Sequence, residues 1–73
     1  MNSFVKICIP FEEKINGCEA EWVWAMPLKF GKYRIDNVPL SPDVRYRDIV
    51  DVDEVDGVLT FRSVVIRPEL EDI

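Results

Sequence analysis

The sequence predicts an all-β fold, namely a small five-stranded antiparallel barrel or strongly bent sheet of SH3-like or related type. The chain has 73 residues, which is room for a single domain with one modest core. Apolar, β-branched runs recur along it and are separated by turn signals such as Asn16-Gly17 and Asp56-Gly57. Trp22 and Trp24 lie two positions apart, so they share one face of a strand but would diverge by about 200° on a helix.

The first two strands are expected over residues 4–9, closed by Pro10, and over residues 18–28. Strict alternation divides the second run into two faces. One face carries Ala20, Trp22, Trp24 and Met26, and the other carries Glu19, Glu21, Val23 and Ala25. In so small a core, two large aromatic side chains on one face favour packing inside, with an exposed binding platform as the alternative. The two glutamates are expected to be solvated.

A third strand is expected over residues 33–38, after a turn around Gly31. Residues 39–45 form the longest irregular connection, because its prolines cannot donate to a ladder. Ser41-Pro42-Asp43 could open one short helical turn, with Ser41 as its cap. Residues 68–73 are expected to form a frayed acidic tail.

The last two strands, residues 46–54 and 58–67, are predicted to pair as a hairpin. Asp56-Gly57 between two apolar runs is the strongest short-range signal for a two-residue hairpin loop. That loop predicts a register in which residue 55 faces 58, 53 faces 60, 52 faces 61 and 51 faces 62. Val52 would then meet Phe61 on one face, and Asp51 would meet Arg62 on the other.

Composition excludes several classes of function. Nine Lys and Arg residues against fourteen Asp and Glu residues give a formal net charge of −5, which disfavours bulk binding to nucleic-acid phosphates. The sequence has no histidine, so His metal sites and His-activated nucleophiles are excluded, and no catalytic, metal or cofactor residue is assigned. Cys8 and Cys18 are expected to be free thiols in a cytoplasmic protein, without a secretory or membrane segment.

Two clusters are candidate partner-binding residues. The first is the acidic run of Asp51, Asp53, Glu54 and Asp56, which does not match a calcium loop, because position 12 counted from Asp51 is an arginine. An acidic hairpin face is the simpler interpretation, and it suits a basic partner. The second cluster is Arg45, Tyr46 and Arg47, which could touch a phosphate or an acidic partner.

Three segments resemble a bacterial family. Glu21 to Ala25, Tyr33 to Pro39 and Asp48-Ile49-Val50 are similar, in order and spacing, to the N-terminal β portion of the domain-of-unknown-function 4265 family. The resemblance covers residues 18–66. It departs at Leu40, where the family prefers an aromatic residue, and at Arg47, where it prefers glycine. It implies a β architecture and a bacterial or phage origin, and it implies no activity.

We therefore expect a non-enzymatic interaction module, an inhibitor or immunity-type protein that presents Asp51–Asp56 to the basic surface of a partner protein, such as a nucleic-acid-binding complex. One alternative is a homodimeric structural or regulatory module that associates through the Trp22 and Trp24 face. The other is a weak nucleic-acid or ligand-binding barrel that uses Arg45 to Arg47. A stable dimer would also add buried area to a chain near the lower size limit for folding.

Overall fold

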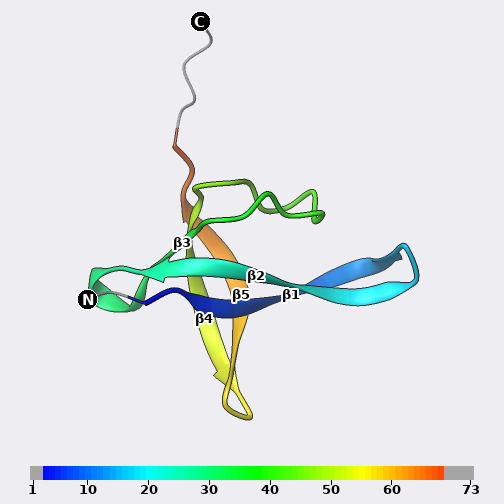
Figure 1. The fold of residues 1–73 in the computed structure, drawn as a ribbon, viewed down its shortest axis with the longest axis horizontal. Helices are drawn as coiled ribbons and strands as arrows, with labels where there is room; N and C mark the ends of the chain where they lie inside the picture. Colours follow the sequence, from blue (N-terminus) through cyan, green and yellow to red (C-terminus); the bar gives the residue numbers. More distant parts are fainter. Residues whose placement is uncertain (1–2, 69–73) are drawn as a thin grey trace, which may run out of the picture.

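A computed structural model describes residues 3–68, and over these residues the fold is all-β apart from one 3₁₀ turn. The elements are β1 (Val5–Ile15), β2 (Cys18–Pro27), the 3₁₀ turn (Lys29–Gly31), β3 (Tyr33–Ile35), β4 (Ile49–Val55) and β5 (Val58–Ile66) (Figure 1). Consecutive strands pair antiparallel, and a parallel contact between Cys8 and Thr60 closes the barrel. The predicted small five-stranded barrel is confirmed. Residues 69–73 of the expected tail lie outside the described residues.

The core is small and is built from the inward positions of four strands and one loop. Its buried members are Ile7 and Ile9 of β1, Val23 and Ala25 of β2, Ile35 of β3, Val50 of β4, and Val44 of the long loop. Five half-buried side chains pack against them, namely Tyr33, Val52, Leu59, Phe61 and Val64. The buried hydrophobic side chains are therefore all aliphatic, and Tyr33 and Phe61 lie at the margin of the core.

β1 and β2 form a long hairpin that extends past the barrel as a two-stranded arm (Figure 1). Its turn, Asn16-Gly17, has φ values of 50° and 80°, as a two-residue hairpin turn of type I′ requires. Pro10 was expected to end the first strand, and this was wrong: Pro10 pairs with Ala20 inside β1. A proline is tolerated there because the register shifts just after it, and bulges and strand edges need no amide donor.

The β4–β5 hairpin has the predicted register near its turn and departs from it further on. Val55 faces Val58, Asp53 faces Thr60 and Val52 faces Phe61, all as predicted. An irregularity between Asp51 and Val52 then places Asp51 opposite Ser63 instead of Arg62. The extra residue lets the strand bend as it joins a closed barrel, which is a common use of a bulge.

β3 and β4 are shorter than expected. β3 ends at Ile35 instead of residue 38, and β4 begins at Ile49 instead of residue 46. Arg47 lies in a turn with a φ of 73°, a conformation that cannot continue a strand. The helical turn expected at Ser41 is absent from residues 36–48, where the Asp43 N–H instead donates to Ser41 Oγ at 3.3 Å.

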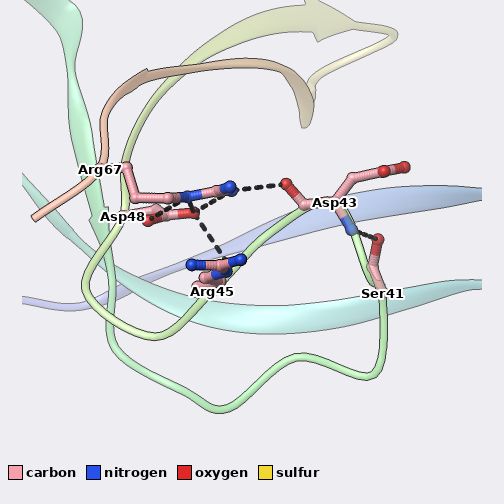
Figure 2. A network of polar contacts seen from close by, with 5 residues as sticks. All are labelled: Ser41, Asp43, Arg45, Asp48 and Arg67. Atoms are coloured by element: carbon pink, nitrogen blue, oxygen red, sulfur yellow. Dashed lines mark hydrogen bonds and ion pairs between the residues drawn. The ribbon is translucent and has the colours of Figure 1, made fainter. Parts of the chain in front are cut away.

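A buried carboxylate organises the end of this long loop (Figure 2). The Asp48 side chain is 1% exposed and accepts hydrogen bonds from the Arg45 N–H at 2.8 Å and from Arg67 Nη2 at 2.9 Å. Arg67 also donates to the Asp43 carbonyl at 3.0 Å. The hydrogen bonds with Asp48 raise the pKa of Arg67, so the guanidinium stays protonated. The loop, the start of β4 and the end of β5 are thereby joined.

A second carboxylate fixes the middle of the same loop. Glu21 was expected to be solvated, and this was wrong: its two oxygens accept from the N–H groups of Leu40 at 3.0 Å and Ser41 at 2.8 Å. The contact joins residues about 20 positions apart in sequence. Glu21 shares the inward face of β2 with Val23, so it extends that face as a polar anchor for the loop.

Candidate interaction surface

The outer face of β2 exposes both tryptophans. Trp22 is 55% exposed and Trp24 is 46% exposed, whereas Val23 and Ala25, on the opposite face, are buried. The interpretation of the tryptophan pair as core was therefore wrong. Alternation showed that the two faces differ, but it did not show which face points inward. A barrel of five short strands has room for valine and alanine at these inward positions, and the indole rings face outward.

Other exposed apolar side chains lie beside the tryptophans. Phe4 is 45% exposed and, with Trp24 and Asp36, lines a shallow depression of about 260 Å³. The ammonium of Lys6 lies 5.1 Å from the centre of the Trp24 ring, within cation–π range. We call the surface formed by Phe4, Trp22 and Trp24 the aromatic face.

The loop after β3 is bonded to β2 and carries two further exposed apolar side chains. The Asp36 backbone N–H donates to the Trp24 carbonyl at 2.8 Å, and Asn37 Oδ1 accepts from the backbone N–H of Trp24. A short polar side chain thus bonds a backbone group where β3 ends. Val38 and Leu40 follow, both largely exposed. Because the loop is bonded to β2 near Trp24 and again at Glu21, the surface rests on a fixed backbone.

The predicted acidic residues are partly neutralised within the chain. Asp51 pairs with Lys32, and Asp53 lies 3.5 Å from Arg62. The ion pairs among residues 3–68 involve neither Glu54 nor Asp56, both of which are exposed near the hairpin tip. The acidic character of this hairpin is thus concentrated at its tip.

The basic cluster lies away from that tip. Arg45, Tyr46 and Arg47 precede β4, whereas Asp56 follows it, so the basic cluster and the acidic tip lie at opposite ends of one strand. All three residues of the cluster are exposed, and the Arg47 guanidinium lies 6.0 Å from the Tyr46 ring. The structure therefore does not bring the basic cluster to the acidic tip of the hairpin.

Among residues 3–68, no three His, Cys, Asp or Glu side chains gather in a way that could hold a metal ion. Cys8 and Cys18 are free, as expected. Cys8 pairs with Trp22 and Cys18 with Ile15, so the two thiols lie on different parts of the hairpin. Burial raises the pKa of the Cys8 thiol, which lowers the fraction of reactive thiolate near neutral pH.

The two thiols should therefore differ in reactivity. At pH 7.5–8, a chosen working range near the ordinary thiol pKa, iodoacetamide is expected to modify exposed Cys18 before Cys8. Peptide mass spectrometry over time measures the two rates, with the unfolded chain in urea as the control in which they converge. Faster modification of Cys8 in the folded protein would contradict its placement between packed strands.

Replacing Trp22 by threonine should cost little stability. Threonine is a good strand former, and cross-strand contacts of an exposed side chain contribute about 1 kcal/mol or less. The control is Val23→Thr, which introduces the same residue at the next position but buries its hydroxyl in the core, at a cost of about 2 kcal/mol. Urea denaturation measures both. A Trp22→Thr loss of about 3 kcal/mol or more would show that this ring is core.

Comparison with known proteins identifies no relative of this chain. No family model, no curated protein and no solved structure matches this chain. The resemblance noted from the sequence therefore stays a prediction. Within residues 3–68, no helix is long and apolar enough to span a membrane.

Proposed function

We propose that this chain is a non-enzymatic protein-interaction module, of the inhibitor or immunity type, that acts by covering a surface of a partner protein. The exposure of Trp22 and Trp24 carries the proposal. Tryptophan is among the residues most enriched at the centres of protein interfaces, where large flat side chains exclude water. Two of them, exposed beside Phe4 on a small barrel, form an apolar surface whose burial by a partner would be favourable.

A basic partner surface fits the charge of the chain. The formal net charge of −5 favours encounter with a positively charged protein, mainly through the association rate. The tip of the β4–β5 hairpin contributes to that attraction, because Glu54 and Asp56 take part in none of the ion pairs among residues 3–68. In this proposal the acidic hairpin steers the partner, and the aromatic face makes the close contact.

The test is affinity capture with matched variants of the full chain. The wild type, Trp22→Thr, Trp24→Thr and Tyr46→Thr are immobilised, and the proteins retained from a native lysate are quantified. Tyr46 is the control because it is an exposed aromatic residue outside the aromatic face. We expect a specific partner to be retained by the wild type and by Tyr46→Thr, and to decrease by about tenfold or more with the tryptophan variants, as for interface hot spots.

Two results would contradict the proposal. One is retention that depends on Tyr46 and not on either tryptophan, which would move the contact to the basic cluster. The other is a self-associated wild type that becomes monomeric on Trp22→Thr by light scattering, which would favour the homodimeric alternative. That alternative is favoured by the same exposed rings, since a second copy could cover them equally.

A further inference from the structure

A second concave region lies on the other part of the molecule, between the hairpin arm and the long loop. Its walls are residues 11–15 of β1 and residues 41–43, and its volume is about 270 Å³. We call it the arm cleft. Phe11 and Ile15 are half-buried and, with Pro42, supply apolar walls. The loop wall is held in place, because Glu21 accepts from the Ser41 N–H at 2.8 Å and Arg67 donates to the Asp43 carbonyl at 3.0 Å.

The arm cleft borders an open strand edge. Successive residues of a strand point to opposite faces, yet all five residues 11–15 line this cleft, so the cleft meets the strand at its edge. β5 pairs with β1 only at Cys8, so within residues 3–68 no strand covers this side of β1 beyond that point. An uncovered edge offers backbone N–H and C=O groups to an added strand.

The charged side chains around the cleft are mainly negative. Its lining includes three carboxylates, those of Glu12, Glu13 and Asp43, and one ammonium, that of Lys14. All four residues are exposed, so none of the charges is sequestered in the core. A long basic side chain matches such a lining, because its apolar stem can lie along Phe11 and its charged end can reach the carboxylates.

We infer that the arm cleft binds an extended, arginine-bearing segment of a partner protein, which adds as a strand to the open edge of β1. This inference rests on the proposed function, since it supplies a second contact and a chemical class for the same kind of partner. Backbone hydrogen bonds to residues 11–15 align the segment, and an arginine placed between Glu13 and Asp43 supplies selectivity.

The test uses a defined probe and does not need the natural partner. The probe is a capped five-residue peptide with valine at its second and fourth positions and arginine at its centre, titrated at millimolar concentration into the ¹⁵N-labelled chain. We expect backbone amide shifts confined to residues 11–15 and 41–43. Replacing the arginine by citrulline, which is neutral and of similar shape, should weaken binding about fivefold. Methylating the backbone nitrogens on one edge of the peptide should abolish it.

Matched variants locate the charge contact. Glu13→Lys is expected to weaken the probe about fivefold or more, whereas Glu19→Lys should leave it unchanged. Glu19 is the control because it is exposed on the same hairpin and does not line the cleft. Equal effects of the two variants, equal binding of the citrulline peptide, or no shifts in residues 11–15 would overturn the inference. So would dimerisation of the free chain through this edge, because a second copy would then be the occupant.

The outcome is separable from that of the proposed function. Trp22→Thr should not change binding of the probe, because Trp22 lies on the outer face of β2 and does not line the cleft. If the tryptophan variants lose the captured partner and the probe does not bind, the arm cleft inference fails and the interaction module stands.

Discussion

Replacing Asp48 by alanine is expected to lower the free energy of unfolding by about 3 kcal/mol. The carboxylate is buried and accepts hydrogen bonds from the Arg45 N–H at 2.8 Å and from Arg67 Nη2 at 2.9 Å. Removing it leaves a buried amide and a guanidinium without their acceptor. Arg67 is partly exposed and can hydrate, which keeps the cost at the lower end for a broken buried pair. A domain of this size has only about 3–5 kcal/mol in total, so the variant should be largely unfolded on mild warming.

The matched control is Asp53→Ala. Asp53 also forms an ion pair with an arginine, Arg62, but at 3.5 Å and with both side chains more than half exposed. Its replacement should cost about 0.5 kcal/mol or less. Urea denaturation followed by far-ultraviolet circular dichroism compares the two. If Asp48→Ala were as stable as Asp53→Ala, the carboxylate would not organise the loop. The network in Figure 2 would then contribute nothing to the free energy of unfolding.

Ile35→Ala is the second large effect, with an expected loss of about 3 kcal/mol. Ile35 is fully buried and belongs to a strand of three residues. Its backbone is also engaged, because its N–H donates to the Asp48 carbonyl at 2.8 Å and its carbonyl accepts from the Arg47 N–H at 2.9 Å. A cavity at this position removes packing where β3 links β2 to β4, and the strand is too short to compensate elsewhere.

The control for Ile35 is Ile66→Ala, the same substitution at an exposed position at the end of β5. We expect Ile35→Ala to lower the melting temperature by about 12 °C or more and Ile66→Ala by a few degrees. Differential scanning calorimetry measures both. Equal shifts would mean that β3 does not contribute to the cooperative core.

Local signals in the sequence predicted the hairpins. Asp56-Gly57 specified both the turn and the pairing of Val52 with Phe61, because a two-residue loop fixes its neighbours geometrically. The predicted register was wrong from Asp51 toward the start of β4. Closing the barrel requires a bulge there, and no local residue pattern indicates it. The prediction that the first strand ends at Pro10 was wrong because proline, although it usually ends a strand, is tolerated where the strand has an open edge.

The loop and the aromatic face depend on contacts between distant residues. The anchoring of residues 40 and 41 by Glu21 spans about 20 positions, so no short pattern reveals it. The side on which Trp22 lies depends on the volume inside the closed barrel, which alternation does not report. Arg47 carries no local signal of its turn, because its φ of 73° is one that glycine, and not arginine, adopts without strain. The candidate partner-binding residues Asp51 to Asp56 and Arg45 to Arg47 stay predictions.

Contact between the aromatic face and a partner protein is tested most directly by site-specific photo-cross-linking in cells that express the chain naturally. Benzoylphenylalanine is placed at position 4, where it replaces an exposed phenylalanine of the aromatic face and leaves both tryptophans intact, at position 54 on the acidic hairpin, or at position 46 in the basic cluster. We expect a discrete protein adduct from position 4, a weaker one from position 54 and none from position 46. Adducts from position 46 alone, or no adduct from position 4 in a folded protein, would contradict the proposal.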